Sequence, residues 1–134
     1  MLHVVLYQPE IPPNTGNVIR LCANTGATLH LVRPLGFEID DARLRRAGLD
    51  YHEYAELRVH DDLEACLAAL PGARWWVVET GEGTRFDRVA YRPGDVLLFG
   101  RETSGLPPEV LGRFAASQRI VLPMRLGQRS LNLS

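Results

Sequence analysis

Residues 3–26 read HVVLYQPEIPPNTGNVIRLCANTG, and this stretch contains one strand–helix unit. Its first five residues form a mostly apolar run with two valines, which is typical of a buried strand. Proline lacks an N–H donor, so the prolines at positions 9, 12 and 13 predict the end of that strand. Apolar residues then recur at helical spacing up to Thr25, with Asn14 or Thr15 as the predicted cap and Gly26 as the stop.

The same alternation of strand and helix continues along the chain. We expect strands at 28–32, 57–59, 75–79, 96–99 and 119–122, and helices at 42–47, 63–70 and 107–114. Asp40–Asp41 and Asp61–Asp62 are the predicted caps of the first two of these helices. The strands are apolar on both faces, which predicts an α/β fold with a mainly parallel sheet and helices on both faces. Ligands of such sheets bind beyond the carboxyl ends of the strands, here residues 8–17, 80–83, 100–106 and 123–130.

Length and composition predict one domain spanning residues 1–134, with enough apolar content for a core. The net charge is −1, and all fifteen basic residues are arginine. Genomic codon bias explains why the basic residues are all arginine, although arginine also binds phosphate better than lysine does, through two parallel N–H donors. We expect Cys22 and Cys66 to be buried reduced thiols. The four histidines show no ligand spacing, so no metal site is predicted.

Several functional classes are disfavoured by missing motifs. The chain contains no G-x-x-x-x-G-K-[ST], no G-x-G-x-x-G after the first strand and no G-x-S-x-G. No apolar run is long enough to span a bilayer, so we expect no membrane partner. The first residues also lack a basic leader and a small-residue cleavage site, and the expected location is the cytoplasm.

The final stretch, QRSLNLS at residues 128–134, has the composition of a helix start. Ser130, Asn132 and Ser134 are residue types whose side chains accept hydrogen bonds from free N–H groups at a helix start. No helix follows in the chain. We therefore expect the last helix to be missing and the domain to be truncated at its C-terminus.

Three stretches carry a resemblance to a known family. They are residues 14–20 (NTGNVIR), 99–107 (FGRETSGLP) and 122–134, which begins LPM and ends SLNLS. Their order and spacing resemble the motifs of the SpoU branch of the SPOUT methyltransferases. Residues 7–17 and 44–52 further resemble the small single-domain members that modify the tRNA wobble nucleotide, so the similarity covers the whole chain.

The resemblance implies properties that periodicity does not. Family members carry a C-terminal trefoil knot whose loops bind S-adenosylmethionine, and they form homodimers through their first and last helices. Knots are rare, so the resemblance alone predicts one here. It also implies methylation of the ribose 2′-hydroxyl of cytidine or uridine at the wobble position, in the anticodon stem-loop of tRNA. No metal is required, because the sulfonium already supplies a leaving group.

Three residues are the catalytic candidates that the resemblance implies. Arg20 matches the arginine of the first motif. As a protonated guanidinium it would bind a phosphate or stabilise alkoxide charge. The alternative is an arginine on the solvent-exposed side of the helix without a role in the site. Asn14 either caps the helix or serves the site. Glu102 either orients Arg20, accepts a ribose hydroxyl or caps the following turn. Arg101 and Ser104 stand where wobble-modifying relatives commonly have proline and arginine, which questions the stiffness of the loop and one phosphate contact.

The resemblance also implies the cofactor contacts, most of them through backbone groups. These residues are Val78, Thr80, Gly100, Leu122, Met124 and Ser130. For Val78 and Leu122, core packing explains the residue type equally well. At Gly100 the absence of a side chain would let adenine or ribose come close to the backbone.

Four arginines form the best local basic cluster: Arg33, Arg43, Arg45 and Arg46. They either contact phosphates of the anticodon stem-loop or form a solvated charged face. Two rival functions stay open at this point. One is a non-catalytic RNA-binding module of the same fold, and the other is a flavodoxin-like ligand-binding domain.

Overall fold

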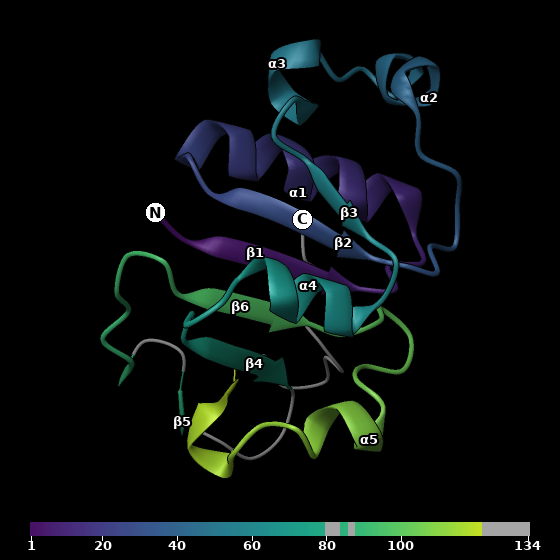
Figure 1. Ribbon diagram of the computed structural model, residues 1–134. Coiled ribbons are helices and arrows are strands. Elements are labelled where there is room, and N and C mark those ends of the chain that lie inside the picture. The colour runs from purple at the N-terminus through teal and green to yellow at the C-terminus, as the bar shows by residue number, and fades with distance from the viewer. Residues whose placement is uncertain (80–83, 86–87, 122–134) are drawn as a thin grey trace, which may run out of the picture.

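The computed structural model describes residues 1–79, 84–85 and 88–121. Within these residues, seven strands form one parallel sheet in the order β3-β2-β1-β6-β4-β7-β5 (Figure 1). The strands are β1 (His3–Tyr7), β2 (Thr28–Val32), β3 (Arg58–His60), β4 (Trp75–Glu79), β5 (Thr84–Arg85), β6 (Val96–Phe99) and β7 (Arg119–Val121). The helices are α1 (Pro12–Thr25), α2 (Asp41–Arg46), α3 (Tyr51–Tyr54), α4 (Leu63–Ala69) and α5 (Pro108–Leu111). The predicted α/β class with a parallel sheet is confirmed.

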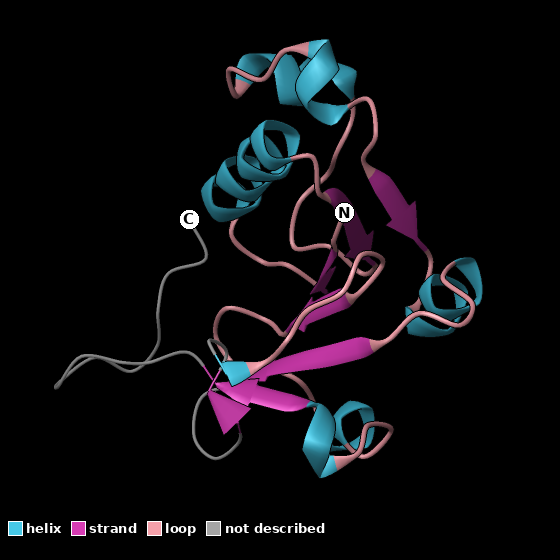
Figure 2. Cartoon of the chain, turned by 90° about the vertical axis from the view of Figure 1, so that its left-hand side faces the viewer, coloured by secondary structure: helices cyan, strands magenta, loops and turns pink. Residues whose placement is uncertain are grey.

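Helices cover both faces of the sheet, and each face has its own core (Figure 2). On one face, Leu6 and Leu31 pack with Val18, Ile19 and Cys22 of α1. On the other face, α4 and α5 contribute to the second cluster. Its buried members are Val5, Val32, Leu63, Cys66, Trp75, Val77, Val96, Leu98, Leu106, Val110 and Phe114. Both cysteines are free and buried, as predicted.

The start of α1 differs from the prediction. The N-cap is Ile11 and not Asn14 or Thr15, and no side chain of the N-cap itself closes the helix end. Two prolines fill the first helical positions, where a missing N–H costs nothing and φ is already helical. The N–H groups of Glu10 and Ile11 lie 2.7 Å and 3.5 Å from the carboxylate oxygens of Glu102. A contact between segments some 90 residues apart therefore marks this helix start.

The other predicted boundaries are close to the observed ones. Asp40 and Asp62 cap α2 and α4, since each carboxylate accepts the N–H three residues further on at 2.8 Å. Gly26 ends α1 with a left-handed φ of 80°. Two short elements, α3 and β5, were not predicted, because four and two residues cannot show a period. The last predicted helix is shorter than expected and ends at Leu111.

The predicted knot and the predicted helix start at residues 128–134 fall within residues 122–134, which lie outside the described residues. None of the helices in the described ranges is both long and apolar enough to cross a membrane.

Asp95 is a buried carboxylate that joins the start of β6 to β4. Arg74 donates to its two oxygens at 3.1 Å and 2.7 Å, and the Trp76 indole N–H donates at 3.0 Å. The N–H of Arg92 adds a bond of 2.9 Å. The residue is 2 % exposed. Arg74, with help from Arg92 and Trp76, lowers the pKa of Asp95 to about 2.

We expect Asp95→Asn to lower the free energy of unfolding by about 2–3 kcal/mol at pH 7, because hydrogen bonds to a charged group are lost. The folded pKa of about 2 lies below the ordinary value of 3.8, so this stabilisation is present above pH 4. It is lost as the pH falls towards 2. Urea unfolding across this range measures the difference between wild type and variant.

Asp61→Asn is the matched control, because it removes an exposed carboxylate from an exposed pair with Arg33. It should change stability by less than about 1 kcal/mol. If the difference between wild type and Asp95→Asn stays constant from pH 7 to pH 2, the carboxylate is not the source of the stabilisation.

Candidate active site

The direction of the chain through the sheet switches beside β1. From β1 the chain passes to β2 and β3 on one side, whereas β6 and β4 lie on the other side. Ligands of open parallel sheets bind beyond the carboxyl ends of the strands at such a switch point. The loops that leave β1 and β6 at this edge are residues 8–11 and 100–107. They adjoin the first motif and contain most of the second.

These two loops are joined by a reciprocal set of hydrogen bonds, which we call the loop clasp. The N–H of Glu10 donates to Glu102 Oε2 at 2.7 Å. In return, Glu10 Oε1 accepts from the backbone N–H of Thr103 at 3.1 Å and from its hydroxyl at 2.8 Å. The two bonds from Thr103 lower the pKa of Glu10. The loop clasp fixes the second motif against the residues that lead into α1.

Arg101 reinforces the loop clasp from the same strand end. Its Nε donates to Gln8 Oε1 at 2.8 Å, and its Nη2 donates to the same oxygen. The guanidinium also lies 5.4 Å from the centre of the Tyr7 ring. Gln8 has a left-handed φ of 48°, a conformation that costs free energy in a residue other than glycine. Arg101 thus holds the loop by side-chain contacts.

Gly100 lies against the backbone of its own loop. A Cβ at this position would lie 2.4 Å from the carbonyl carbon of Gly105 and 2.5 Å from the nitrogen of Leu106. Arg101 and Gly105 close the loop with backbone bonds of 3.2 Å and 2.9 Å. The glycine is therefore required by the loop itself, and the predicted approach of a ligand at Gly100 stays a prediction.

Arg20 lies past the middle of α1, at the ninth of its fourteen positions. Counting six residues from the predicted Asn14 cap would place it near the helix start, but the helix begins earlier, at Pro12. Its Nε donates to Glu53 Oε2 at 3.0 Å, and its Nη2 donates to the carbonyl of Gly48 at 3.1 Å. These bonds use two of the five N–H donors of a guanidinium. The Arg20 side chain stays 45 % exposed. Arg20 is therefore held at a fixed place between α1 and α3 while part of it still faces solvent.

Glu53 is the residue at this site that sequence reasoning missed. Its Oε1 accepts the N–H of Asp50 at 2.8 Å, and its Oε2 pairs with Arg20. The bond from Asp50, followed by the bond from Arg20, lowers the pKa of Glu53. One predicted role of Glu102 was to orient Arg20, but the carboxylate paired with Arg20 is that of Glu53. The D-x-x-E spacing of a capping box was the only available signal, and it indicates a helix start and not a site.

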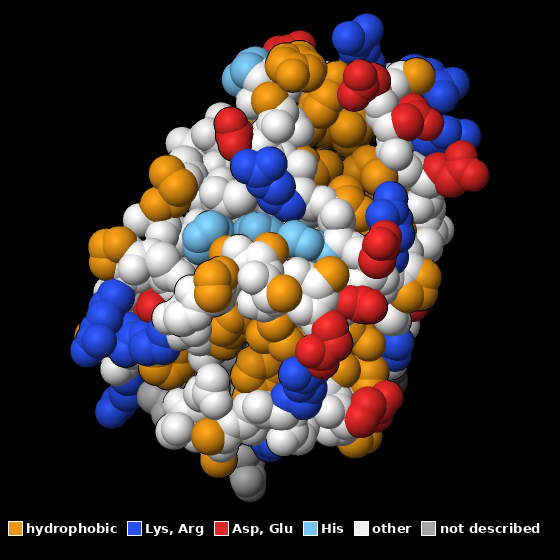
Figure 3. Space-filling view, in the orientation of Figure 1, with side chains coloured by type: hydrophobic (Ala, Val, Ile, Leu, Met, Phe, Trp, Pro, Cys, Tyr) orange, Lys and Arg blue, Asp and Glu red, His pale blue; other side chains and the backbone are white. Residues whose placement is uncertain are grey.

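The arginines predicted to bind RNA are exposed on α2 and at the end of β2. Arg43, Arg45 and Arg46 lie on α2, and acidic side chains lie among the basic ones in this region (Figure 3). Arg43 forms ion pairs with two nearby acids. Arg33 pairs with Asp61 at 3.0 Å. These surface pairs are weak, so the guanidinium groups can exchange them for phosphates.

Comparison with known proteins gives the family. The model of the SpoU rRNA Methylase family matches residues 1–134. The chain belongs to this family. The resemblance of its three motifs is thereby confirmed.

Two further comparisons are close over nearly the whole chain. The tRNA (cytidine(34)-2′-O)-methyltransferase of Methylovorus glucosotrophus is 58 % identical over 134 residues, which cover all of this chain and 87 % of that protein. A structure solved for insights into the 2-OH methylation of C/U34 on tRNA has a TM-score of 0.88 and 51 % identity. The match covers 99 % of this chain and 86 % of that one.

A more distant fold neighbour contains the methyl donor. This is an AdoMet-bound rRNA methyltransferase from Sinorhizobium meliloti, with a TM-score of 0.79 and 24 % identity. The match covers 98 % of this chain and 51 % of that one. At this identity the likeness concerns the fold alone.

Two of the six predicted cofactor residues of this SpoU chain, Val78 and Gly100, lie within the described residues. Val78 is half-buried on β4, in register with Phe99 and Ile120 on the neighbouring strands. Gly100 directly follows β6. The remaining candidates, Thr80, Leu122, Met124 and Ser130, lie outside the described residues. Asn14 is half-buried in the first turn of α1.

Thr15 is a further polar residue of the first turn of α1. It is 2 % exposed, and its hydroxyl has no hydrogen-bond partner within the described part of the chain. A buried hydroxyl without a partner is costly, so a polar ligand at the start of α1 would stabilise it.

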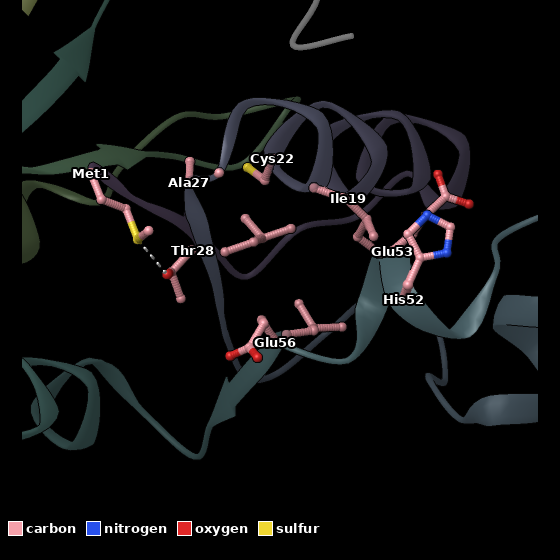
Figure 4. Close-up of a pocket in the computed structure, with 12 residues that line it drawn as sticks. Met1, Ile19, Cys22, Ala27, Thr28, His52, Glu53 and Glu56 are labelled. Atoms are coloured by element: carbon pink, nitrogen blue, oxygen red, sulfur yellow. Dashed lines mark hydrogen bonds between the residues drawn. The ribbon is translucent and has the colours of Figure 1, made fainter.

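A separate cavity of about 460 Å³ lies between α1, β2 and α3 (Figure 4). Met1 and Thr28 lie at one end, near the amino end of β2, and His52 and Glu53 lie at the other. The cavity therefore contacts the partner of Arg20 but is not at the carboxyl edge of the sheet, where the loop clasp lies. We do not assign the methyl donor to it.

We expect Gly100→Ala to destabilise this SpoU domain by about 2 kcal/mol or more, because the new methyl would overlap the backbone of residues 105 and 106. Gly16→Ala is the matched control. Gly16 lies inside α1, and a Cβ there meets nothing within 4 Å. That change should stabilise the protein by about 0.5–1 kcal/mol. Denaturant unfolding measures both, and equal effects of the two alanines would contradict the tight packing at Gly100.

Proposed function

We propose that this chain is an S-adenosylmethionine-dependent RNA 2′-O-methyltransferase whose substrate is the wobble cytidine or uridine of tRNA. The name of the M. glucosotrophus relative and its 58 % identity support the reaction and the substrate. Membership of the family supports the same reaction class over a non-catalytic RNA-binding module. Because tRNA is the substrate, the expected location is the cytoplasm.

The observation that best supports catalysis is the fixed position of Arg20. Glu53 and the Gly48 carbonyl hold the guanidinium from one side, and the exposed part keeps further N–H donors. A cation fixed before the reaction stabilises developing negative charge without the cost of reorganisation. We assign to Arg20 the binding of the substrate phosphate and the stabilisation of the 2′-oxygen as its proton is lost.

The reaction is an in-line displacement at a methyl carbon. S-adenosylmethionine supplies the methyl group, the bond from sulfur to carbon breaks, and the bond from the ribose oxygen to carbon forms as the hydroxyl proton passes to solvent. The chain contributes mainly by positioning, which can lower a barrier by about 7–11 kcal/mol. In our proposal, Arg20 and Asn14 position the ribose, and the loop clasp that contains Glu102 supports the donor side.

Three described residues near the carboxyl edge of the sheet support a site for an adenosyl group there. Val78 and Phe99 present half-buried apolar side chains on neighbouring strands. Thr15 offers a buried hydroxyl that needs a partner. We propose that these residues, Gly100 and the predicted positions Thr80, Leu122, Met124 and Ser130 together hold the donor.

We further propose that Arg33, Arg43, Arg45 and Arg46 contact the anticodon stem-loop, and that the protein is a homodimer. Arg20 bonds to Gly48, which follows α2, so the basic helix is linked to the catalytic candidate. Leu21 on the outer side of α1 is 53 % exposed, which supports a dimer contact through this helix.

We expect Arg20→Ala to lower kcat for tRNA methylation by about 10²–10³-fold, as loss of a charge-stabilising donor does. Glu53→Gln should cause a smaller loss, because the amide keeps an acceptor for Arg20 but removes the negative charge. Transfer of a labelled methyl group, with nucleoside mapping at position 34, measures both effects. Calorimetry with S-adenosylmethionine should give unchanged affinity for the two variants.

Arg113→Ala is the control, since Arg113 is an exposed arginine paired with Glu64 on the other face of the sheet. It should keep full activity. Normal methylation by Arg20→Ala would contradict the assigned role. Binding of tRNA without any methyl transfer by the wild type would favour the RNA-binding module instead.

We expect the triple variant R43A/R45A/R46A to raise KM for tRNA at least tenfold while the affinity for S-adenosylmethionine stays constant. Each lost phosphate contact should reduce the slope of log affinity against log salt by about 0.7–0.9. Titrations of tRNA at several salt concentrations measure this slope. An unchanged slope would show that α2 does not contact phosphates.

A further inference from the structure

A row of histidines crosses the face of the sheet that α4 covers (Figure 3). His3 Nδ1 lies 3.0 Å from His30 Nε2, and His30 Nδ1 lies 2.9 Å from His60 Nε2. The three residues come from the adjacent strands β1, β2 and β3. In the parallel register, His3 pairs with Thr28 and His30 pairs with Arg58. His30 therefore lies two residues after the partner of His3, and His60 lies two residues after the partner of His30. The parallel register, and not the sequence spacing, brings them together.

Cys66 of α4 lies over this row. One ligand atom from each of His30, His60 and Cys66 lies within 4.8 Å of the other two. Cys66 is 0 % exposed and His30 is 4 % exposed, whereas His60 is partly exposed and gives access from solvent. Cys22, the other thiol, belongs to the core on the opposite face of the sheet, so the two cysteines cannot form a disulfide.

We propose that His30, His60 and Cys66 form a binding site for a borderline-soft transition-metal ion, with Zn²⁺ as the best fit. Two imidazole nitrogens and one thiolate are ligands that Zn²⁺ and Cu⁺ prefer, whereas Mg²⁺ and Ca²⁺ require oxygen. Three protein ligands leave a fourth position for water. The ion would pin α4 to the edge strand β3 and to β2.

The geometry needs only small movements of side chains. Zinc binds nitrogen at about 2.0–2.1 Å and sulfur at about 2.3 Å, so neighbouring ligand atoms in a tetrahedral site lie about 3.3–3.6 Å apart. The two facing nitrogens, now 2.9 Å apart, would separate by a few tenths of an ångström. The sulfur would move closer to them. The ion takes the place that a shared proton occupies between His30 and His60.

His3 supplies the outer contact that such a site requires. When His30 donates its Nε2 proton to His3 Nδ1, its Nδ1 lone pair is free for the metal. Ligating histidines usually donate their other N–H in this way, which fixes the tautomer and the ring orientation. The proton that His60 Nε2 donates to His30 Nδ1 without metal moves through solvent to His60 Nδ1, so that His60 Nε2 can bind the metal. All three imidazoles stay neutral, so the only proton released is that of the Cys66 thiol.

Loss of the Cys66 thiol proton sets the pH dependence of binding, and a nearby positive charge opposes the ion. Cys66 is fully buried, so its thiol is protonated without metal and binding must displace that proton. Arg58 is the charged group that acts on both His30 and His60, and its positive charge opposes a cation. The thiolate offsets part of this repulsion. Because the thiol must lose its proton to bind the metal, the affinity for Zn²⁺ should increase as the pH rises from 6 to 8.

The test uses the full chain after treatment with a chelator, titrated with Zn²⁺ by calorimetry and with Co²⁺ by absorption. We expect one ion per chain, release of about one proton per ion and a thiolate-to-cobalt charge-transfer band. Thermal unfolding should shift to higher temperature with Zn²⁺, because the ion binds the folded chain.

Variants separate this site from non-specific binding. Cys66→Ala and His60→Asn should each lower Zn²⁺ affinity by 100-fold or more, and Cys66→Ala should abolish the charge-transfer band. His3→Asn should lower affinity by about 10–100-fold, as loss of an outer hydrogen bond does. Cys22→Ala and His52→Asn are the controls, a buried thiol and an exposed histidine away from the site. Both should bind Zn²⁺ normally.

Three results would overturn the proposal. They are no Zn²⁺ or Co²⁺ bound per folded chain, a cobalt complex without a thiolate band, and equal losses of affinity in Cys66→Ala and Cys22→Ala. If Cys66→Ala proves unstable, His60→Asn alone decides the matter, because His60 is partly exposed. Any of the three results would leave the row as metal-free hydrogen-bonded imidazoles. The test does not depend on methyl transfer and is independent of the proposed function.

Discussion

Two carboxylates hold the carboxyl edge of the sheet together. Glu102 accepts the N–H of Glu10, and Glu10 accepts the N–H and the hydroxyl of Thr103. In this way the residues that enter α1 and the loop that leaves β6 become one structure, although they are some 90 residues apart. The start of α1, the left-handed Gln8 and the tight turn at Gly100 all lie around this contact. These hydrogen bonds thus fix the two loops at the switch point relative to each other.

Arg20 and α2 are linked to this frame through α1. The guanidinium bonds to Gly48 and Glu53, which lie between α2 and α3 and within α3. Helix α1 therefore begins beside the edge at which we propose that the methyl donor binds, and it carries Arg20, the proposed catalytic cation, past its middle. The exposed arginines of α2 lie only a few residues before Gly48. In our proposal, the contact with the RNA backbone and the contact with the reacting ribose therefore depend on the same small unit.

Sequence reasoning succeeded where the signal is local. The caps at Asp40 and Asp62, the stop at Gly26 and the apolar strands all depend on neighbours within a few residues. It failed where the contact is distant: the partner that marks the start of α1 is Glu102, and the partner of Arg20 is Glu53. The histidines were missed for the same reason, because only the pairing of β1, β2 and β3 places them in a row. Family resemblance supplied the site residues, several of which lie after position 121, outside the described residues.

We propose that the methyl donor binds at the loop clasp and not in the cavity between α1, β2 and α3. Titration of isotope-labelled protein with S-adenosylmethionine, followed by the chemical shifts of backbone amides, tests it most directly. If the donor binds there, the largest shifts will occur in residues 8–17 and 99–106, together with slower hydrogen exchange at the amides of Glu10 and Thr103. Shifts concentrated at Ala27, Thr28 and His52, with residues 99–106 unchanged, would contradict it.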